Sequence, residues 1–494
     1  MKILMISPLA PDSFWSFKYA IKFLKKKATF PPLGLLTVAS MLPEKWEKRL
    51  VDMNTTKLSN RDLLWADYVF LGAMIIHRQS VEQIINRCKK LKVKIVAGGP
   101  LFTMEYADYV NKIDHLVLNE AEATLPDFIN DLKSGKPKRI YKSDKFPNII
   151  NSPAPLWKLI NLKKYASISI QYSRGCPFHC DFCNVTTLFG RKMRKKTASQ
   201  VMNELNGVYD AGYRGSIFFV DDNFIGTISS LKQELLPALI EWKKSHPEMY
   251  FFTEVSINIA DDKELMKMMR LAGFDQVFIG IETPSNEGLA ESNKTQNHNR
   301  NLVRDIKRIQ RHGLQVQGGF IVGFDSDSPS IFQDQIDFIQ ECGITTAMVG
   351  LLQAPEGTKL YDRLIKAKRL NKYVSGDNFD GSTNIIPVSM DIGALKKGYK
   401  NILDKIYSPK YYYKRIKIFL REYQNQGIKE PLSINRIMAF LRSLFIIGIL
   451  GKERFHYWNL LLWTSFRCPE HFPMAVNLSI IGFHFRKTVK CHVK

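Results

Sequence analysis

The chain has 494 residues and a formal net charge of +24 at pH 7, with 45% hydrophobic and 24% charged residues. Such a composition is normal for a folded protein and excludes a disordered one, and the length predicts two or three domains. The seven cysteines are odd in number and four of them are scattered, which excludes the framework of a secreted disulfide protein.

The chain begins with a short apolar run, Met1 to Pro8. This run is too short for a signal peptide and lacks a small-residue cleavage site, so it favours a β-strand. We therefore expect a cytoplasmic protein.

The first 140 or so residues alternate short apolar strands with helical patterns. This alternation predicts a doubly wound parallel sheet, and such sheets bind ligands beyond the carboxyl ends of their strands. Helical spacing covers residues 33–42 and 81–91. The expected strands are residues 2–7, 49–53, 68–72, 95–97 and 115–118.

A linker rich in Pro and Lys, residues 135–155, leads to a second alternating series. The clearest helix in it starts at Thr197, which forms a capping box with Gln200, and stops at Gly212. Six βα units predict a partial barrel, which places its chemistry on the loops after its strands. The expected strands are residues 166–172, 216–221, 250–257, 276–282, 315–322 and 346–352.

Beyond about residue 375 the pattern is wholly helical and strongly basic. Residues 394–494 contain 19 lysines and arginines against 5 acidic residues, which places +14 of the net charge in this fifth of the chain. Apolar runs at 443–450 and 457–463 are shorter than the roughly 20 residues that a bilayer crossing needs, and Arg436 and Arg442 interrupt the longest candidate. We expect no membrane span. The pattern favours either peripheral contact with an anionic membrane or the solvated face of an ordinary helical domain.

The predicted fold class is α/β, with a Rossmann-like doubly wound domain, a partial (β/α)6 barrel and a C-terminal helical domain. Residues 1–145 form the first domain and residues 146–165 the linker. The barrel covers residues 166–375, and the basic helical domain covers residues 376–494.

Three cysteines, Cys176, Cys180 and Cys183, lie within eight residues on the loop after the first barrel strand. This spacing lets one loop hold three corners of a cubane iron–sulfur cluster and leaves the fourth iron open. A structural zinc site would need a fourth ligand, for which His179 is the candidate inside the loop. The position in the barrel favours the cluster.

These cysteines and their place in the barrel resemble the radical S-adenosyl-L-methionine (SAM) superfamily, in which the open iron chelates the methionine part of SAM. Phe182, directly before the third cysteine, agrees with that family's pattern. Each carboxylate that follows a later strand can singly be a helix cap or a solvated strand end, but their shared position favours binding. The resemblance implies SAM contacts from Phe182, Asp221, Asp222, Glu254, Glu282, Gly319 and Gly323.

The first domain is similar to the cobalamin-binding domain that precedes many radical SAM barrels. Proteins that ligate cobalt from below commonly offer Asp-x-His-x-x-Gly, whereas this chain has Asn54 at the His position and Lys57 at the Gly position. Imidazole ligation from that loop is therefore excluded, and we expect five-coordinate or weakly capped cobalt. His77 either approaches the corrin or is an ordinary surface or packed residue. Glycines permit the close approach that this flat cofactor needs. The resemblance implies cobalamin contacts from Asn54, Gly72, Met74, Gly98, Gly99, Pro100, Thr103 and Glu120.

Residues 152–157, 189–195 and 452–458 resemble the branch that contains the hopanoid C-2 methylases. The resemblance implies a radical SAM C-methyltransferase that takes hydrogen from an unactivated carbon with a 5′-deoxyadenosyl radical and adds a methyl group from methylcobalamin. It also implies an apolar lipid or isoprenoid-like substrate, a one-electron donor such as flavodoxin or ferredoxin, and peripheral membrane contact. A helical lid over any apolar substrate would use the same C-terminal aromatic residues.

Two other functions fit parts of the sequence. A non-methylating cyclase would keep both cofactors and differ in the mass of its product. The positive charge favours phosphate, and RNA-modifying radical enzymes share the cysteine spacing. Those enzymes carry three further cysteines in the first domain, where this chain has only Cys88, so nucleic acid is the least favoured partner.

Overall fold

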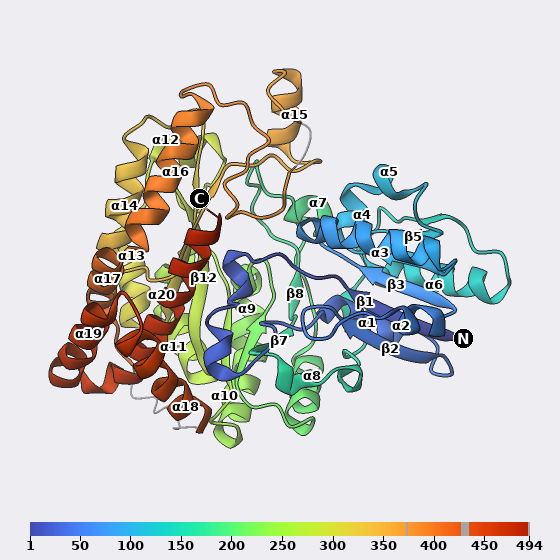
Figure 1. Cartoon of the computed structure of the whole chain (residues 1–494), viewed down its shortest axis with the longest axis horizontal. Coiled ribbons are helices and arrows are strands. Elements are labelled where there is room, and N and C mark those ends of the chain that lie inside the picture. The colour runs from blue at the N-terminus through green and yellow to red at the C-terminus, as the bar shows by residue number, and fades with distance from the viewer. Residues whose placement is uncertain (372–373, 426–433, 493–494) are drawn as a thin grey trace. The chain divides into compact units, whose positions relative to one another are not determined.

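The computed structural model describes residues 1–371, 374–425 and 434–492 (Figure 1). The chain forms two compact units, and both draw on separate segments of the sequence. The first consists of Met1–Pro11, Lys27–Pro177 and Asn184–Arg214, and the second of Asp12–Lys26, Phe178–Cys183 and Gly215–Lys494.

A six-stranded parallel sheet forms the first unit, with the order β2-β1-β3-β4-β5-β6. This order confirms the predicted doubly wound sheet and places its topological switch point between β1 and β3. The short β6 has no sequence signal because only two residues pair. The strands are β1 (Lys2–Ser7), β2 (Glu47–Asp52), β3 (Tyr68–Gly72), β4 (Lys94–Gly98), β5 (His115–Val117) and β6 (Ile140–Tyr141).

Alternate side chains of these strands enter two separate cores. Leu4 and Ile6 of β1 pack in one core with α3 and α4, whereas Ile3 and Met5 pack in the other with α1 and α6. The two-residue period of an extended chain produces this division, so helices cover both faces of the sheet. The helices are α1 (Leu33–Met41), α2 (Asn60–Trp65), α3 (Arg78–Lys90), α4 (Pro100–Met104), α5 (Tyr106–Tyr109) and α6 (Ala121–Lys133).

The first unit also contains the segments that flank the cysteine loop. A short antiparallel pair joins β8 (Ser173–Arg174) to β9 (Arg194–Lys195). The predicted capping box is present, since Gln200 N–H donates to Thr197 Oγ1 over 3.2 Å and Thr197 N–H donates to Gln200 Oε1 over 3.0 Å. The remaining elements are β7 (Ser167–Ile170), α7 (Val185–Phe189) and α8 (Ala198–Asp210).

Five parallel strands pair in chain order in the second unit. They confirm the expected alternation of strands and helices, and the sixth expected strand is β7 of the first unit. The strands are β10 (Ser216–Phe219), β11 (Tyr250–Glu254), β12 (Phe274–Glu282), β13 (Gln315–Val322) and β14 (Ala347–Leu351). The main helices between and after them are α10 (Leu236–Ser245), α11 (Lys263–Ala272), α12 (Asn286–Glu291), α13 (Leu302–Arg311), α14 (Ile331–Glu341) and α15 (Lys359–Lys366).

A segment from near the N-terminus, Asp12–Lys26, belongs to the second unit. The Phe14 ring stacks on Phe485 with centroids 4.3 Å apart and lies 5.2 Å from the Phe379 ring. The imidazole Nε2 of His484 lies 3.1 Å from the carbonyl oxygen of Phe14. The contacts of Phe14 with His484 and Phe485 join sequence positions about 470 residues apart.

The C-terminal part of the chain is helical from Ile392 onward (Figure 1), as expected from the sequence, although the helical pattern was expected from about residue 375 and the described residues 374–391 form no helix. None of the helices in the described part of the chain combines the length and the apolar content that a bilayer crossing requires. The elements are α16 (Ile392–Ile406), α17 (Pro409–Glu422), α18 (Ile434–Ser443), the π-helix η10 (Leu444–Ile449), α19 (Arg454–Arg467) and α20 (Phe472–His492).

Candidate functional site

Asn54 follows β2, and its amide is engaged by its own loops. Its Oδ1 accepts from Ala10 N–H over 3.0 Å, and its Nδ2 donates to Asp52 Oδ1 over 2.7 Å and to the Pro8 carbonyl over 3.2 Å. Tyr165 donates its hydroxyl hydrogen to the other Asp52 oxygen over 2.8 Å. The residue that replaces the cobalt-ligating His of other proteins therefore ties the loops after β1 and β2 together.

Two exposed apolar side chains follow the strands at the switch point of the first unit. Met74, after β3, is 53% exposed, and Leu9, after β1, is 50% exposed. Exposed thioether and aliphatic groups at this edge suit the face of a large flat ligand. Sequence reasoning missed Leu9, although its place directly after β1 was a usable signal.

His77 is not poised as a cobalt ligand in this structure. Its Nδ1 accepts from Met74 N–H over 3.1 Å, and burial lowers its pKa to about 4. The ring is therefore neutral, with one nitrogen lone pair already used. Gly72, at the end of β3, is glycine because an added Cβ would lie 2.9 Å from the Leu35 side chain.

Gly98 and Gly99 lie so close to neighbouring backbone atoms that a side chain at either position would clash with them. An added Cβ on Gly98 would lie 2.6 Å from the Val117 carbonyl oxygen. Gly99 has φ +99°, and its Cβ would lie 2.9 Å from the Ala73 carbonyl oxygen. The loops after β3 and β4 thus touch through backbone alone, which brings Pro100, the first residue of α4, close to the strand ends.

Thr103 of α4 and Asn119 join that helix to the loop after β5. The Thr103 hydroxyl oxygen accepts from Asn119 N–H over 2.9 Å, and Asn119 has φ +62°, a left-handed conformation that Asn tolerates better than most residues. The predicted contact residues of the first domain therefore lie at the carboxyl edge of one sheet.

Glu120 lies in a buried ion-pair cluster. Its carboxylate contacts Arg174 at 2.6 Å and Arg194 at 2.8 Å, and Glu122 contacts Arg174 at 2.8 Å. Burial alone would raise the pKa of Glu122, but hydrogen bonds from Arg174 outweigh it and lower that pKa to about 2. Because Arg174 precedes Gly175 and Cys176, the cluster fixes the start of the cysteine loop.

Cys176 enters its loop through a tight backbone contact. Gly175 has φ +97°, and an added Cβ would lie 3.0 Å from the carbonyl oxygens of Gly190 and Lys192. Cys176 N–H donates to the Gly190 carbonyl over 3.3 Å. The sequence after the cysteines therefore closes back on the first of them.

The part of the loop around Cys180 is held by the segment between α12 and α13. Asp181 N–H donates to the Ser292 carbonyl over 3.0 Å, and the Asn293 amide donates to the His179 carbonyl over 2.9 Å. The Gln296 amide lies 3.8 Å from Cys180 Sγ, within the limit for a hydrogen bond to sulfur. Burial raises the pKa of Cys180, and the Lys294 ammonium opposes that effect.

Lys294 and Glu282 form a buried ion pair at 2.6 Å. Burial opposes the charge of Lys294, but its pKa is raised because Glu282 and the thiols of Cys180 and Cys183 favour the ammonium form. A fixed cation beside two thiols stabilises their thiolates, which are the ligands that a cluster requires.

Glu282 is placed by a bulge at the end of β12. It has φ +66°, an uncommon conformation for a side chain of this size, and the register of β12 with β13 shifts between Gly280 and Glu282. The Asn297 amide donates to the carbonyls of Gly280 and Ile281, each over 3.0 Å. Asn297 thereby holds the backbone on both sides of the register shift, and the Ile281 carbonyl also accepts from Thr283 N–H over 2.9 Å.

Asp221, Asp222 and Glu254 form a cluster of carboxylates at the ends of β10 and β11, which are paired neighbours. Burial, with the negative charges of Asp222 and Asp221, raises the pKa of Glu254 to about 8. Such a group is prepared for a cation, because a bound positive charge would restore its ionised form. The cluster fits an ammonium ligand.

Gly319 and Gly323 lie on and after β13. An added Cβ on Gly319 would lie 2.8 Å from the Phe278 ring. Gly323 has φ +107°, and its N–H donates to Asp327 Oδ2 over 2.8 Å, as does that of Phe324 over 3.0 Å. Burial raises the pKa of Asp327 to about 6.

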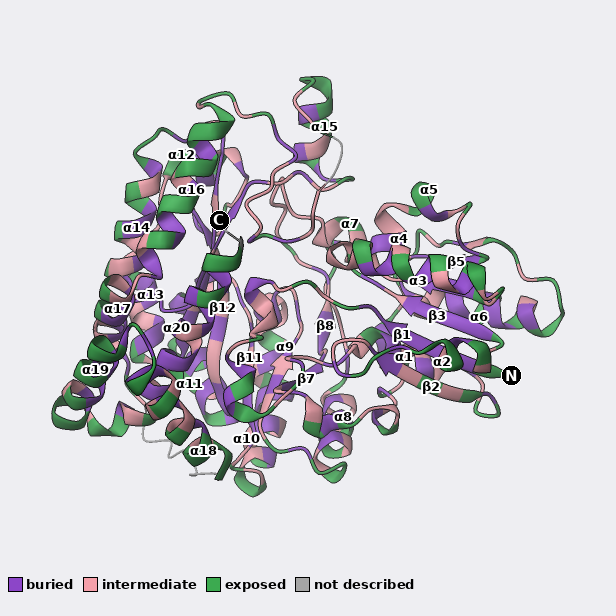
Figure 2. Cartoon of the chain, in the orientation of Figure 1, coloured by how far each residue is buried: buried purple, intermediate pink, exposed green. Residues whose placement is uncertain are grey.

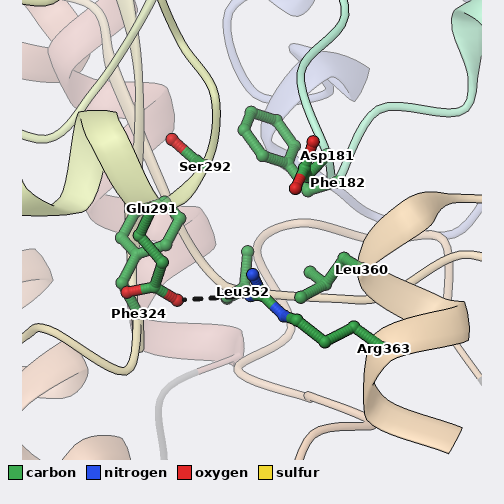
Figure 3. Close-up of a pocket in the computed structure, with 8 residues that line it drawn as sticks. All are labelled: Asp181, Phe182, Glu291, Ser292, Phe324, Leu352, Leu360 and Arg363. Carbon is green, nitrogen blue, oxygen red and sulfur yellow. Dashed lines mark hydrogen bonds and ion pairs between the residues drawn. The ribbon is translucent and has the colours of Figure 1, made fainter. Parts of the chain in front are cut away.

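Phe182 lines a small cavity of the second unit (Figure 3). Its ring packs against the core formed by Phe324, Leu352 and Leu360. Glu291 and Arg363 pair at 3.4 Å on the opposite side of the same cavity. The aromatic residue before the third cysteine is therefore a packing residue of the barrel that holds the loop backbone in place.

Sequence reasoning named the cysteines and the carboxylates as candidates, but it missed the residues that contact and position them. Lys294, Gln296, Asn297 and Arg174 have no motif of their own, and their roles follow only from their contacts. The residues present fit the three cofactors of the predicted family, since three uncrosslinked cysteines, a carboxylate cluster and an exposed apolar strand edge are all there.

Comparisons with known proteins agree with this arrangement. Three family models match the chain. The B12 binding domain matches residues 23–129, the Radical SAM superfamily matches residues 170–339, and a domain of unknown function, DUF4070, matches residues 358–494. An uncharacterized methyltransferase of Synechocystis is 34% identical over 98% of this chain and 91% of its own length. The hopanoid C-2 methylase of Rhodopseudomonas palustris is 32% identical over 93% of this chain and 89% of its own.

Solved structures show the same fold at low sequence identity. The cobalamin-dependent S-adenosylmethionine radical enzyme OxsB has a TM-score of 0.63 at 16% identity, covering 99% of this chain and 80% of its own. The radical S-adenosylmethionine methyltransferase TsrM from Kitasatospora setae has a TM-score of 0.60 at 15% identity, covering 99% of both chains. The chain therefore belongs to the cobalamin-dependent radical SAM methyltransferases, whose cofactors are a [4Fe-4S] cluster, SAM and cobalamin.

Proposed function

We propose that the protein methylates an unactivated carbon of an apolar, isoprenoid-like lipid. The similarity to a hopanoid C-2 methylase supports this substrate class. The structural observation that supports this proposal is that the barrel strands of the second unit have one buried face and one half-exposed apolar face.

One face of these strands is buried and the other is half-exposed. Ile217 and Phe219 of β10 are fully buried, whereas Phe218 between them is half-exposed. Apolar side chains left half-exposed along one face are what an apolar ligand would cover. The same pattern holds for Phe252, Phe278, Ile321 and Met348.

Aromatic rings dominate this half-exposed face. The rings of Phe218 and Phe252 stack with centroids 4.8 Å apart and an interplanar angle of 5°. The polar side chains at its other end, Gln276 and Gln317, hydrogen-bond to each other over 2.5 Å. The polar groups are thus paired with each other and leave the rings as the surface for a ligand.

Trp15 extends the same face from the N-terminal segment. Its ring centroid lies 5.3 Å from that of Phe278, and its indole N–H donates to Met348 Sδ over 3.2 Å. Trp15 is itself half-exposed. A rigid aromatic ring that is held by two neighbouring side chains would restrict the size of an apolar substrate.

The residues divide the work among the cofactors. When bound, the cluster with SAM supplies hydrogen abstraction, and cobalamin supplies the methyl group. We assign the cluster to Cys176, Cys180 and Cys183, and the ammonium group of SAM to the carboxylate cluster at Glu254. The aromatic face would exclude water from the reacting carbon.

Further contacts follow from the position of the remaining residues. Glu282, Gly319 and Gly323 are assigned to other parts of SAM, with Phe182 supporting the cysteine loop. The cobalamin contacts are assigned to the carboxyl edge of the first sheet, namely Asn54, Gly72, Met74, Gly98, Gly99, Pro100, Thr103 and Glu120. A one-electron donor such as flavodoxin or ferredoxin would reduce the cluster, and the enzyme would meet its lipid substrate at a membrane surface.

The test is anaerobic reconstitution with iron, sulfide and hydroxocobalamin and the addition of SAM and a one-electron donor, followed by an assay for 5′-deoxyadenosine and by mass spectrometry of lipids. Lipid extract from a host that lacks the gene should gain a species heavier by one methylene. Cys180→Ala should abolish both products. If the parent cleaves SAM but no lipid changes in mass, the substrate class is wrong although the family assignment stands.

A further inference from the structure

Exposed apolar side chains gather on one part of the second unit. Of the 24 large apolar side chains that are exposed in the described part of the chain, 11 lie between residues 434 and 466. Figure 2 colours much of α18 and α19 as exposed. We call this set the apolar stripe, and it consists of Ile434, Ile437, Met438, Leu441, Phe445, Ile449, Leu450, Phe455, Trp458, Leu462 and Phe466.

The spacing of the apolar stripe is helical. Its members recur every three or four residues, so they form one face of α18 and η10 and one face of α19. The opposite face of the same helices is also apolar and is buried, as at Ile447, Leu460 and Leu461. A solvated helix would carry polar side chains on its outer face, so this surface calls for a partner.

The two helices are joined rigidly beneath the stripe. Tyr457 and Ser443 share a hydrogen bond of 2.7 Å, and the Trp458 indole N–H donates to the Gly448 carbonyl over 3.0 Å. The Tyr457 ring lies against Gly448, where an added Cβ would be 3.2 Å away. The stripe is therefore a fixed surface of two packed helices rather than a set of independent side chains.

The charges around the stripe are almost entirely positive. Between residues 434 and 467 the chain has five lysines and arginines and one acidic residue, Glu453. Glu453 is buried and paired with Arg486 at 2.6 Å, whereas Lys452, Arg454 and Arg467 are exposed. A second copy of the same surface would bring like charges together, so self-association is disfavoured. An anionic membrane surface matches both the apolar and the charged part.

We infer that α18, η10 and α19 form a membrane-docking surface, which lays the apolar stripe into the headgroup region of an anionic bilayer. The depth of such insertion is roughly 5 to 10 Å for interfacial helices. Within residues 1–371, 374–425 and 434–492, none of the helices is long and apolar enough to cross the bilayer. The purpose of docking rests on the proposed lipid substrate, but the binding itself does not depend on it. The surface gives the enzyme access to apolar molecules that are dissolved in the membrane.

The test uses the reconstituted full chain and co-sedimentation with two kinds of vesicle. One contains phosphatidylglycerol and phosphatidylcholine in equal amounts, and the other contains phosphatidylcholine alone. The parent should bind the anionic vesicles at least about tenfold more tightly, and added salt should weaken that binding. The double variant Phe455→Ala and Phe466→Ala, at side chains 75% and 83% exposed, should lose about tenfold or more in affinity.

The matched control is Leu64→Ala on α2, an exposed apolar residue of the first unit that lies outside the stripe. It should bind vesicles as the parent does. Equal binding of the double variant and the parent would overturn the inference, as would a parent that ignores anionic vesicles. Sedimentation without vesicles tests the alternative that a second copy of the chain binds the stripe. A dimeric parent and a monomeric double variant would show that the stripe is a contact between copies.

The two proposals can fail separately. Methylation of a lipid presented in detergent micelles, without any vesicle binding, would leave the proposed function intact and remove the docking surface. Vesicle binding that depends on the stripe, without methylation of any lipid, would support the docking surface and contradict the proposed function.

Discussion

At the scale of single residues, the arrangement around Lys294 and Glu282 depends on the absence of a side chain at Gly280. An added Cβ there would lie 2.5 Å from Glu282 Oε1 and 2.9 Å from Lys294 Nζ. Both atoms belong to one buried ion pair, so a shift of either side chain alone separates it from its charge partner, and loss of a partner from a buried ion pair is costly.

We therefore expect Gly280→Ala to slow 5′-deoxyadenosine formation by about tenfold or more, in line with an overpacking cost of about 1 to 3 kcal/mol. The rate is measured on the reconstituted enzyme at saturating SAM. Gly34→Ala serves as the control, because an added Cβ at Gly34 meets nothing within 4 Å. If the Gly280→Ala enzyme forms 5′-deoxyadenosine at the parent's rate, the Lys294–Glu282 arrangement is not needed for that reaction.

The Glu122 carboxyl provides a pH dependence with a definite sign. Its pKa is lowered from 4.5 to about 2 because the bonds from Arg174 outweigh the effect of burial. A lowered pKa stabilises the fold above pH 4.5, and this contribution is lost as the pH falls from 4.5 toward 2. The shift corresponds to about 3 kcal/mol.

Glu122→Gln should therefore lower the thermal unfolding midpoint at pH 7 and show a smaller further decrease than the parent as the pH falls from 4.5 toward 2. Calorimetry or circular dichroism across this range makes the measurement. Glu82→Gln is the comparison, because Glu82 pairs with Lys112 at an exposed position and should change little. The same pH profile for parent and Glu122→Gln would contradict the ion-pair account.

At the scale of elements, the close packing of α17 against α20 depends on Gly482. The Tyr412 hydroxyl donates to the Leu478 carbonyl over 2.8 Å, and an added Cβ on Gly482 would overlap the Tyr412 ring. Small residues let two helices approach closely, and neither helix can shift without breaking that hydrogen bond.

Gly482→Ala should lower the free energy of unfolding by about 1 to 3 kcal/mol, which chemical denaturation followed by circular dichroism can detect. An Ala in the exposed helix position of Gly34 should instead be neutral or stabilise by about 0.5 to 1 kcal/mol. Equal effects of the two substitutions would show that helix propensity, rather than contact with Tyr412, decides the result.

The sequence predicted the elements well and their partners poorly. The strands were readable because two-residue alternation and buried apolar runs are local signals, and the capping box at Thr197 was readable for the same reason. The bulge at Glu282 could not be predicted, because it is associated with two hydrogen bonds from Asn297, and no local sequence pattern marks that residue. Cys88 was readable as a lone thiol. Its burial in α3, which raises its pKa to about 11, identifies it as a core residue.

At the scale of the whole molecule, the chain crosses between its units more often than its sequence pattern suggests. The segment Asp12–Lys26 leaves the first sheet after β1 and packs in the second unit, where Phe14 is almost fully buried. The same segment carries Trp15 to the half-exposed face of the barrel strands. The stability of the second unit thus depends on residues near the start of the chain.

Phe14→Ala should destabilise the second unit by about 3 to 5 kcal/mol, the usual cost of removing a buried phenyl ring. Hydrogen exchange of α20 peptides should become faster, because Phe485 and His484 lie on that helix and contact Phe14. Phe455→Ala, at a side chain 75% exposed, should leave exchange unchanged. Unchanged protection of α20 in Phe14→Ala would contradict the anchoring role of this segment.

The sequence by itself determined the class of chemistry. Ligand spacing on one loop, alternation of strands and helices, and turn glycines are local properties, and they were enough to indicate a cluster-binding barrel behind a doubly wound sheet. Only the tertiary structure decided which side chains support that chemistry. The contacts of Lys294 with Glu282, of Arg174 with Glu120, and of Trp15 with Met348 join segments that are 12, 54 and 333 residues apart. Such contacts arise from the packing of whole elements, so no local pattern encodes them.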